Sequence, residues 1–283
     1  MALFKKNQPA DDGTEMSFID HLEALRWHLV RSVVAVVVCA MLIFIYAKEV
    51  VTIIIMGPAR NDFSTYSFLC NLGHKLHLGE ALCLGDFTIK FQSNAMTEQF
   101  MTTFTIAFVG GFIVSFPYVF WEFWRFIKPA LSKKEVRKTR GIIFWVSVLF
   151  FMGVAFGYYV LTPFMVNFYS NYSLSPLIEF KPTLSDYIEN LIYTTVGIGV
   201  LFQMPLLIMF LSKIGIVSPS FLKKYRKHAF VIILIAAAII TPSTDPFSLT
   251  LVTIPLYALF EASVLLSSRV YKQREREDAE EWS

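Results

Sequence analysis

The chain has 283 residues, of which 55% are hydrophobic and only 17% are charged, and phenylalanine alone contributes 28. A soluble domain carries about 25% charged residues, so this composition excludes an ordinary soluble enzyme or binding domain and predicts an integral membrane protein. The net charge of +3 says little about partners, because the charges are gathered into a few short segments.

The N-terminal region predicts a polar, disordered lead over residues 1–16, followed by an amphipathic helix. Ser17 is placed to cap this helix, and Phe18, Leu22 and Leu25 recur at helical spacing. We expect the helix to continue into the first apolar segment. No small-residue cleavage site follows that segment, so it is expected to remain in the protein as an anchor.

Intervals without charged residues predict six membrane-spanning helices, since about 20 helical residues cross a hydrocarbon core of about 30 Å. The intervals are 32–47, 99–121, 141–178, 190–212, 228–244 and 246–268, of which only the last is interrupted, by Glu261. The third is too long for one straight span, and Pro163 is expected to end its helix. The fifth holds only about 18 Å of firmly apolar helix, which implies local bilayer thinning or shielding by partners.

The distribution of Lys and Arg predicts the orientation. With the N-terminus inside, the inner segments hold 20 of these residues and the outer segments hold 5, a strong positive-inside signal. The fold class expected is therefore an all-α membrane protein with six transmembrane helices and both termini cytoplasmic. Its membrane domain covers residues 17–270, with an outer loop at 48–96, a cytoplasmic loop at 122–140 and a charged cytoplasmic tail at 271–283.

Cysteine and histidine occur together in the outer loop. Cys70 and Cys83 could form a disulfide if the outer side is an oxidising compartment, and two free thiols are the alternative. His74 and His77 lie three residues apart, which is a weak metal signal. We interpret them as surface histidines and expect no metal site.

One carboxylate, Glu135, lies within the strongly basic end of the cytoplasmic loop. Ser132 and Glu135 fit a capping box, which is the purely structural interpretation. The functional interpretation is that the carboxylate binds a guanidinium group through two hydrogen bonds. An exposed pair contributes only about 0–1 kcal/mol, so such a site would need shelter. Neighbouring aromatic residues could provide it or could simply form an interfacial belt: Trp121, Phe123, Trp124 and Phe126.

Two polar residues fall within the predicted spans. Gln203 is followed by Pro205 and should face another helix or a polar cavity, because a lone amide in lipid is costly. Glu261 is an ionisable group within the last span, which favours a functional role. The structural alternatives are a helix-to-helix hydrogen bond for Gln203 and a protonated or paired carboxyl near the headgroups for Glu261.

No pattern typical of an enzyme is found: there is no HExxH, no GxSxG and no glycine-rich phosphate loop. His21 and His28 lie seven residues apart, on roughly one helical face, and no role follows from that spacing. We therefore expect no enzymatic activity and no cofactor. A secondary transporter with a polar site at Gln203 and Glu261 is the alternative function, although neither an internal repeat nor a broken helix pair is evident.

Several motifs, in this order and spacing, resemble the TatC family, a subunit of the twin-arginine protein translocase, over nearly the whole chain. No single motif is decisive. The matching residues are His21-Leu22-Glu23-Ala24-Leu25-Arg26, Pro58, Phe116-Pro117, Trp124, Phe126-Ile127, Pro129-Ala130-Leu131, Glu135, Phe202-Gln203-Met204-Pro205, Thr241-Pro242, Asp245, Pro255 and Glu261.

The resemblance implies a receptor and scaffold for signal peptides with paired arginines, in a translocase for folded proteins that is driven by the proton-motive force. It implies a cupped helical bundle with structured periplasmic loops in the bacterial inner membrane. The partners implied are TatA- and TatB-like single-span proteins, twin-arginine signal peptides, membrane lipids and further copies of the chain, with no nucleic acid.

The resemblance also assigns roles to residues. Signal-peptide binding is expected of Glu135, Glu23, Arg26, Phe126, Pro129 and Leu131. Contact with a partner helix is expected of Gln203, Pro205, Thr241, Leu249 and Glu261, and a structural role of Pro58 and Asp245.

The sequence departs from the family pattern at two of its positions. Ala24 stands where the family has a second N-terminal glutamate, and Glu23 points about 100° away around the helix. Leu249 stands where a glutamine is common, with Thr241 and Thr250 nearby. Both departures predict weaker polar contacts at these positions.

Overall fold

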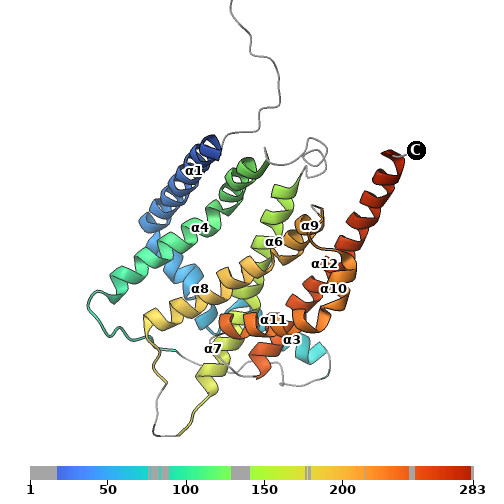
Figure 1. The fold of residues 1–283 in the computed structure, drawn as a ribbon. Helices are drawn as coiled ribbons and strands as arrows, with labels where there is room; N and C mark the ends of the chain where they lie inside the picture. The colour runs from blue at the N-terminus through green and yellow to red at the C-terminus, as the bar shows by residue number, and fades with distance from the viewer. Residues whose placement is uncertain are drawn as a thin grey trace, which may run out of the picture.

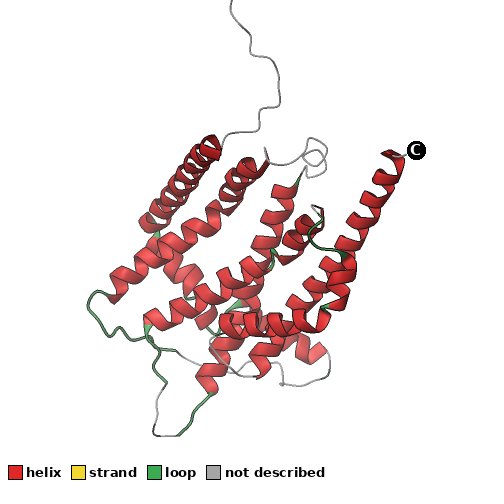
Figure 2. Ribbon diagram, viewed as in Figure 1, coloured by secondary structure: helices red, strands yellow, loops and turns green. Residues whose placement is uncertain are grey.

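The computed structural model describes residues 18–75, 77, 83, 89–128, 141–175, 177, 180–213, 215–241 and 246–281. Within these residues the fold is helical and contains no strand, as Figures 1 and 2 show. The principal helices are α1 (Phe18–Ile45), α3 (Ser64–Lys75), α4 (Glu98–Ile127), α6 (Ile142–Phe156), α7 (Thr162–Asn171), α8 (Leu184–Leu201), α9 (Met204–Lys213), α10 (Pro219–Lys224), α11 (Arg226–Ile240) and α12 (Pro246–Glu281). Shorter elements are α2 (Ala47–Glu49), η1 (Val50–Ile55), η2 (Gly57–Ala59) and η5 (Gly157–Leu161).

Five helical segments in the described part of the chain are long and apolar enough to cross a membrane. They are Leu22–Ile45, Glu98–Ile127, Ile142–Asn171, Leu184–Lys213 and Ser248–Lys272. The remaining expected span, 228–244, corresponds to α11, whose 15 residues rise only about 22 Å. An all-helical membrane protein is thus confirmed, whereas the count of six spans and the orientation stay predictions.

The expectation that Pro163 ends its helix is wrong. α6, the π-helical η5 and α7 follow one another without interruption from Ile142 to Asn171. Pro163 lies in the first turn of α7, where the preceding π turn shifts the hydrogen-bonding pattern and the missing N–H is tolerated. The Thr162 hydroxyl also donates to the carbonyl of Gly157 at 2.9 Å, which satisfies one acceptor at this irregular turn.

Helix ends elsewhere follow local sequence signals. Ser218 caps α10, because its hydroxyl accepts a hydrogen bond from the Phe221 backbone N–H at 3.2 Å and Pro219 follows at the first helical position. Thr183 caps α8 in the same way by accepting from the Asp186 N–H at 3.1 Å. Polar groups with short side chains thus set where these two helices begin.

α1 and α4 lie side by side along one flank of the molecule (Figure 1). Their backbones meet at Gly111, where a Cβ atom would lie 2.7 Å from the backbone nitrogen of Ala40. At the neighbouring Gly110, a Cβ would instead meet the end of the flexible Ile43 side chain at 2.8 Å. Only glycine at 111 permits this approach without moving a backbone.

The buried core of the opposite flank joins α8, α9, α11 and α12. Its most enclosed side chains include Ile198, Ala237, Val252 and Leu256, none of them more than 1% exposed. Inside this core the hydroxyls of Ser212 on α9 and of the serine at 267 on α12 share a hydrogen bond of 2.7 Å. The two flanks are joined through α6 and α8, which pack on each other.

The segment that follows α1 packs against α7 and α8. Pro58 is fully buried there. The Tyr66 hydroxyl donates to the Pro58 carbonyl at 2.6 Å, and the Tyr187 hydroxyl donates to the Ile55 carbonyl at 2.6 Å. Burial raises the pKa of the Tyr66 hydroxyl well above its ordinary value, so it remains a donor at any physiological pH. Tyrosine hydroxyls therefore satisfy carbonyls that the irregular turns of η1 and η2 leave open.

Candidate functional site

Three of the residues expected to bind a signal peptide, Pro129, Leu131 and Glu135, lie outside the described residues. The other three are described. Glu23 and Arg26 present exposed side chains on α1, and Phe126 is half-buried in the last turn of α4. The structure brings the first part of α1 to the end of α4 (Figure 1).

A buried carboxylate joins these two helix ends. Glu122 of α4 is 1% exposed, and its Oε2 lies 2.5 Å from Nδ1 of His28 on α1. The Tyr118 hydroxyl donates to Glu122 Oε1 at 3.1 Å, and the Arg125 guanidinium lies 3.5 Å from the same oxygen. The ring of His28 in turn meets the edge of Phe126, with 6.3 Å between ring centroids. We call Glu122, His28, Tyr118 and Arg125 the inner clasp.

The inner clasp fixes α1 relative to α4. A buried carboxylate is costly unless partners replace its water, and here two come from its own helix and one from α1. Arg125 is further held by the Trp121 ring, whose centroid lies 5.0 Å from the guanidinium carbon. Removal of one member would leave its buried partners without the hydrogen bond or the counter-charge that it supplies.

Sequence reasoning missed Glu122. Tyr118 and Arg125 stand four and three residues away, a spacing that places all three on one helical face, and this signal was present in the sequence. The α1 partner, His28, lies 94 residues away, and no local pattern connects it to α4. The aromatic residues around Glu122 are typical of an interfacial belt, and that pattern gives no role to the carboxylate between them.

Gln203 lies at the break between α8 and α9. Its Nε2 donates to the carbonyls of Val146 on α6 at 3.3 Å and of Gly199 on α8 at 3.4 Å. Its Oε1 is buried without a hydrogen-bond partner in the described part of the chain. An orphaned buried acceptor costs about 1–3 kcal/mol. Because the oxygen is enclosed by the protein, a donor from outside the chain would reach it only after neighbouring side chains move. Pro205, also expected at this site, is buried in the first turn of α9.

The other residues expected to contact a partner helix do not join Gln203 in one hydrogen-bonded cluster. Glu261 accepts from Arg226 of α11 at 2.8 Å and from the Tyr257 hydroxyl at 3.1 Å, so it is a paired carboxyl. The Thr241 hydroxyl is buried and donates to a carbonyl of α11. Leu249 packs against the core of α12 and its neighbours. The transporter alternative needs Gln203 and Glu261 in one polar site, and their hydrogen bonds instead lead to different helices.

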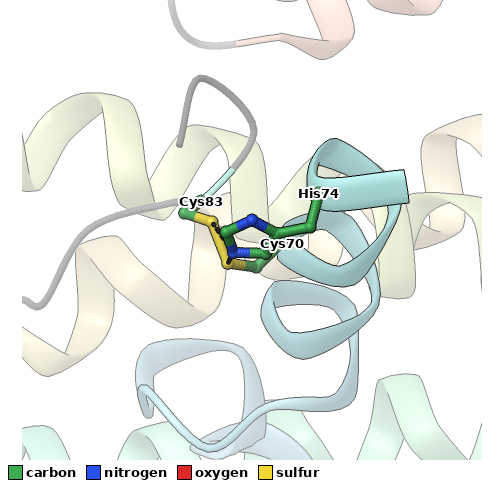
Figure 3. A group of neighbouring side chains, drawn as sticks. All are labelled: Cys70, His74 and Cys83. Carbon is green, nitrogen blue, oxygen red and sulfur yellow. Dashed lines mark hydrogen bonds between the residues drawn. A yellow bond between two sulfur atoms is a disulfide. The ribbon is translucent and has the colours of Figure 1, made fainter. Parts of the chain in front are cut away.

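The remaining site residues were expected to have a structural role. Asp245 lies outside the described residues, and Pro58 is enclosed as described above. The structure joins Cys70, on α3, to Cys83 by a disulfide with 4.2 Å between the Cα atoms (Figure 3). Cys39 on α1 is a free cysteine.

Comparison with known proteins gives one consistent family. The family model described as Sec-independent protein translocase protein (TatC) matches residues 20–255. The TatC protein of Blattabacterium sp. subsp. Periplaneta americana is 40% identical over 265 residues, which cover 93% of this chain and 99% of that protein. The TatCy protein of Bacillus subtilis is 30% identical over 265 residues, 94% of each chain.

Solved structures agree with the sequence relatives. A crystal structure of the twin arginine translocase receptor TatC superposes with a TM-score of 0.64 at 26% identity and covers 88% of this chain and 99% of that one. A second structure of a receptor so described, in DDM, gives a TM-score of 0.69 at 27% identity over 87% and 99% of the two chains. The similarity therefore extends over almost the whole fold.

Proposed function

The chain belongs to the TatC family of Sec-independent protein translocases, and on that premise we propose that it is the receptor and scaffold subunit for twin-arginine signal peptides in the bacterial inner membrane. The observation that carries this proposal is the match, over 99% of their length, to structures described as twin arginine translocase receptors. TatA- and TatB-like single-span proteins are the partners, and the proton-motive force supplies the energy for transport of folded proteins.

Glu135 is proposed to accept one or both arginines of the signal. A carboxylate on an otherwise basic segment attracts guanidinium selectively, since it can accept two parallel hydrogen bonds from one Arg. In the sequence, Glu135 follows the end of α4 by eight residues. The signal would then pass over Glu23, Arg26 and Phe126.

The inner clasp gives this surface its shape. Glu23 and Arg26 lie within about one and a half turns of His28 on α1, and Phe126 touches the His28 ring from α4. A clasp that holds α1 on α4 therefore sets the distance between the two sides of the proposed binding surface.

Gln203 is proposed to receive a polar group of a partner helix. Its unpartnered Oε1 would accept a hydrogen bond once the side chains that enclose it move aside, while its Nε2 remains bound to α6 and α8. In an apolar setting such a bond confers orientation as well as affinity.

The test is photocross-linking of a twin-arginine signal peptide to probes at positions 134 and 136. We expect strong cross-links in the native chain and their loss in Glu135→Ala and Glu135→Arg. Glu49→Ala, which removes an exposed carboxylate from α2, is the matched control and should leave the yield unchanged. Normal cross-linking in the Glu135→Arg chain would contradict the assigned role.

A gain-of-function variant tests the same surface independently. Ala24→Glu adds a carboxylate one turn before His28 on α1, and we expect it to lower the dissociation constant of the signal peptide. A dissociation constant equal to that of the native chain would end the idea that position 24 faces the signal.

A further inference from the structure

The outer segment holds a cluster of two cysteines and one histidine that the proposed receptor role does not use. Cys70 and His74 lie one turn apart on the same face of α3, and Cys83 meets them from the following segment (Figure 3). Nε2 of His74 lies 3.6 Å from the Cys70 sulfur and 3.8 Å from the Cys83 sulfur. One ligand atom from each residue falls within 4.8 Å of the others.

Of the three ligand-to-ligand distances in the cluster, the two sulfur-to-nitrogen distances match those of a tetrahedral zinc site, and the sulfur-to-sulfur distance does not. Zinc lies about 2.3 Å from thiolate sulfur and about 2.0–2.1 Å from imidazole nitrogen, so tetrahedral angles place sulfur and nitrogen about 3.6 Å apart and two sulfurs about 3.8 Å apart. The two sulfur-to-nitrogen distances, 3.6 and 3.8 Å, are therefore already close to the distance that zinc would impose. Only the two sulfurs, now bonded, would have to separate.

The cluster is open to the reagents that such a change needs. Cys70 and Cys83 are half-buried and His74 is exposed, so an ion or a reductant can reach them. Two thiolates and a neutral imidazole are a borderline-soft ligand set, which suits zinc. Three protein ligands leave a fourth position for water.

We propose that Cys70, His74 and Cys83 form a redox-controlled zinc site. A dithiol reductant transfers two electrons and two protons to the disulfide, which gives two thiols, and the reductant becomes its own disulfide. Zn²⁺ then displaces both thiol protons and is bound by the two sulfurs and by His74 Nε2. Oxidation by a disulfide oxidant expels the metal and restores the bond between Cys70 and Cys83.

The experiment compares the oxidised and reduced full-length protein in mild detergent. Each form is titrated with Zn²⁺ against a chromophoric zinc chelator, after the reductant has been removed without oxygen. We expect one zinc ion per reduced chain and none per oxidised chain. Cobalt substitution of the reduced chain should add a thiolate-to-cobalt charge-transfer band, which reports sulfur ligation directly.

Variants identify the ligands. His74→Ala should weaken zinc binding by the reduced chain at least about tenfold, since even outer-sphere partners contribute that much. His77→Ala removes a neighbouring exposed histidine, and Cys39→Ser removes the cysteine on α1; both should stay within about twofold of the native affinity. Disulfide formation in oxidised His74→Ala chains verifies that the segment still folds.

Three results would overturn the proposal: no zinc bound to the reduced chain, equal binding by the oxidised chain, or native affinity in His74→Ala. If His74→Ala does not fold, Cys83→Ser replaces it, and the proposal then fails if the cobalt-substituted variant still shows the charge-transfer band of a two-thiolate site. Signal-peptide binding is measured in parallel, so failure here does not bear on the receptor role.

Discussion

The inner clasp gives the sharpest prediction about stability. Glu122→Ala deletes the acceptor shared by His28 and Tyr118 and the counter-charge of Arg125. Glu122→Gln is the matched control, because it keeps the length of the side chain and one acceptor oxygen. The contrast between the two variants isolates the carboxylate from the space that it fills.

The magnitude follows from the burial of each partner. Loss of one member of a buried charged pair costs about 3–5 kcal/mol. The side chains of His28 and Arg125 are 18% and 45% exposed, so they can regain water and the lower end, about 3 kcal/mol, applies to Glu122→Ala. Glu122→Gln keeps a neutral hydrogen bond and should cost only about 1 kcal/mol.

The assay is reversible unfolding in mixed micelles with increasing denaturing detergent, followed by tryptophan fluorescence. A double-mutant cycle with His28→Ala and Glu122→Ala measures the coupling directly, and we expect about 1.5 kcal/mol or more, as for residues within one network. A coupling below about 0.5 kcal/mol, the scatter seen for independent sites, would refute the claim that the clasp joins α1 to α4.

Three further predictions concern packing and the segment that follows α1. Gly111→Ala should destabilise by about 1–3 kcal/mol because its Cβ meets the α1 backbone, whereas Gly110→Ala meets only a movable isoleucine and should cost less; equal costs in an unfolding assay would contradict this. Tyr66→Phe leaves a buried carbonyl without its donor and should cost about 1–2 kcal/mol, so native stability would be unexpected. Reduction of the bond between Cys70 and Cys83 in metal-free buffer should cost about 3 kcal/mol for a closed segment of this length, as measured by unfolding of the reduced and oxidised forms.

The parts of the fold that depend on local chemistry were predictable from the sequence. Ser218 before Pro219 set a helix start, and the helical spacing around Leu22 led without a break into the first span. The membrane class followed from composition alone, and the family from the order of short motifs. These features need only residues that are close in the chain.

The parts that depend on pairing across the fold were not predictable in the same way. Glu122 finds His28 94 residues away, and Glu261 finds Arg226 35 residues away, and neither partner is marked by a spacing rule. The prediction that Pro163 ends its helix was wrong because proline breaks a helix when a regular α turn precedes it. Here a π turn precedes it instead. Glycine positions such as Gly111 could be counted in the sequence, but not the backbone that each one meets.

The length of α12 has a consequence for any probe attached to this protein. Its 36 residues rise about 54 Å, well beyond a hydrocarbon core of about 30 Å, and about 14 Å of it follows Lys272. A fluorescent protein or dye attached after Glu281 would therefore be held by a rigid helix instead of a flexible linker. Energy-transfer distances measured from such a label would then track rotation of the whole subunit.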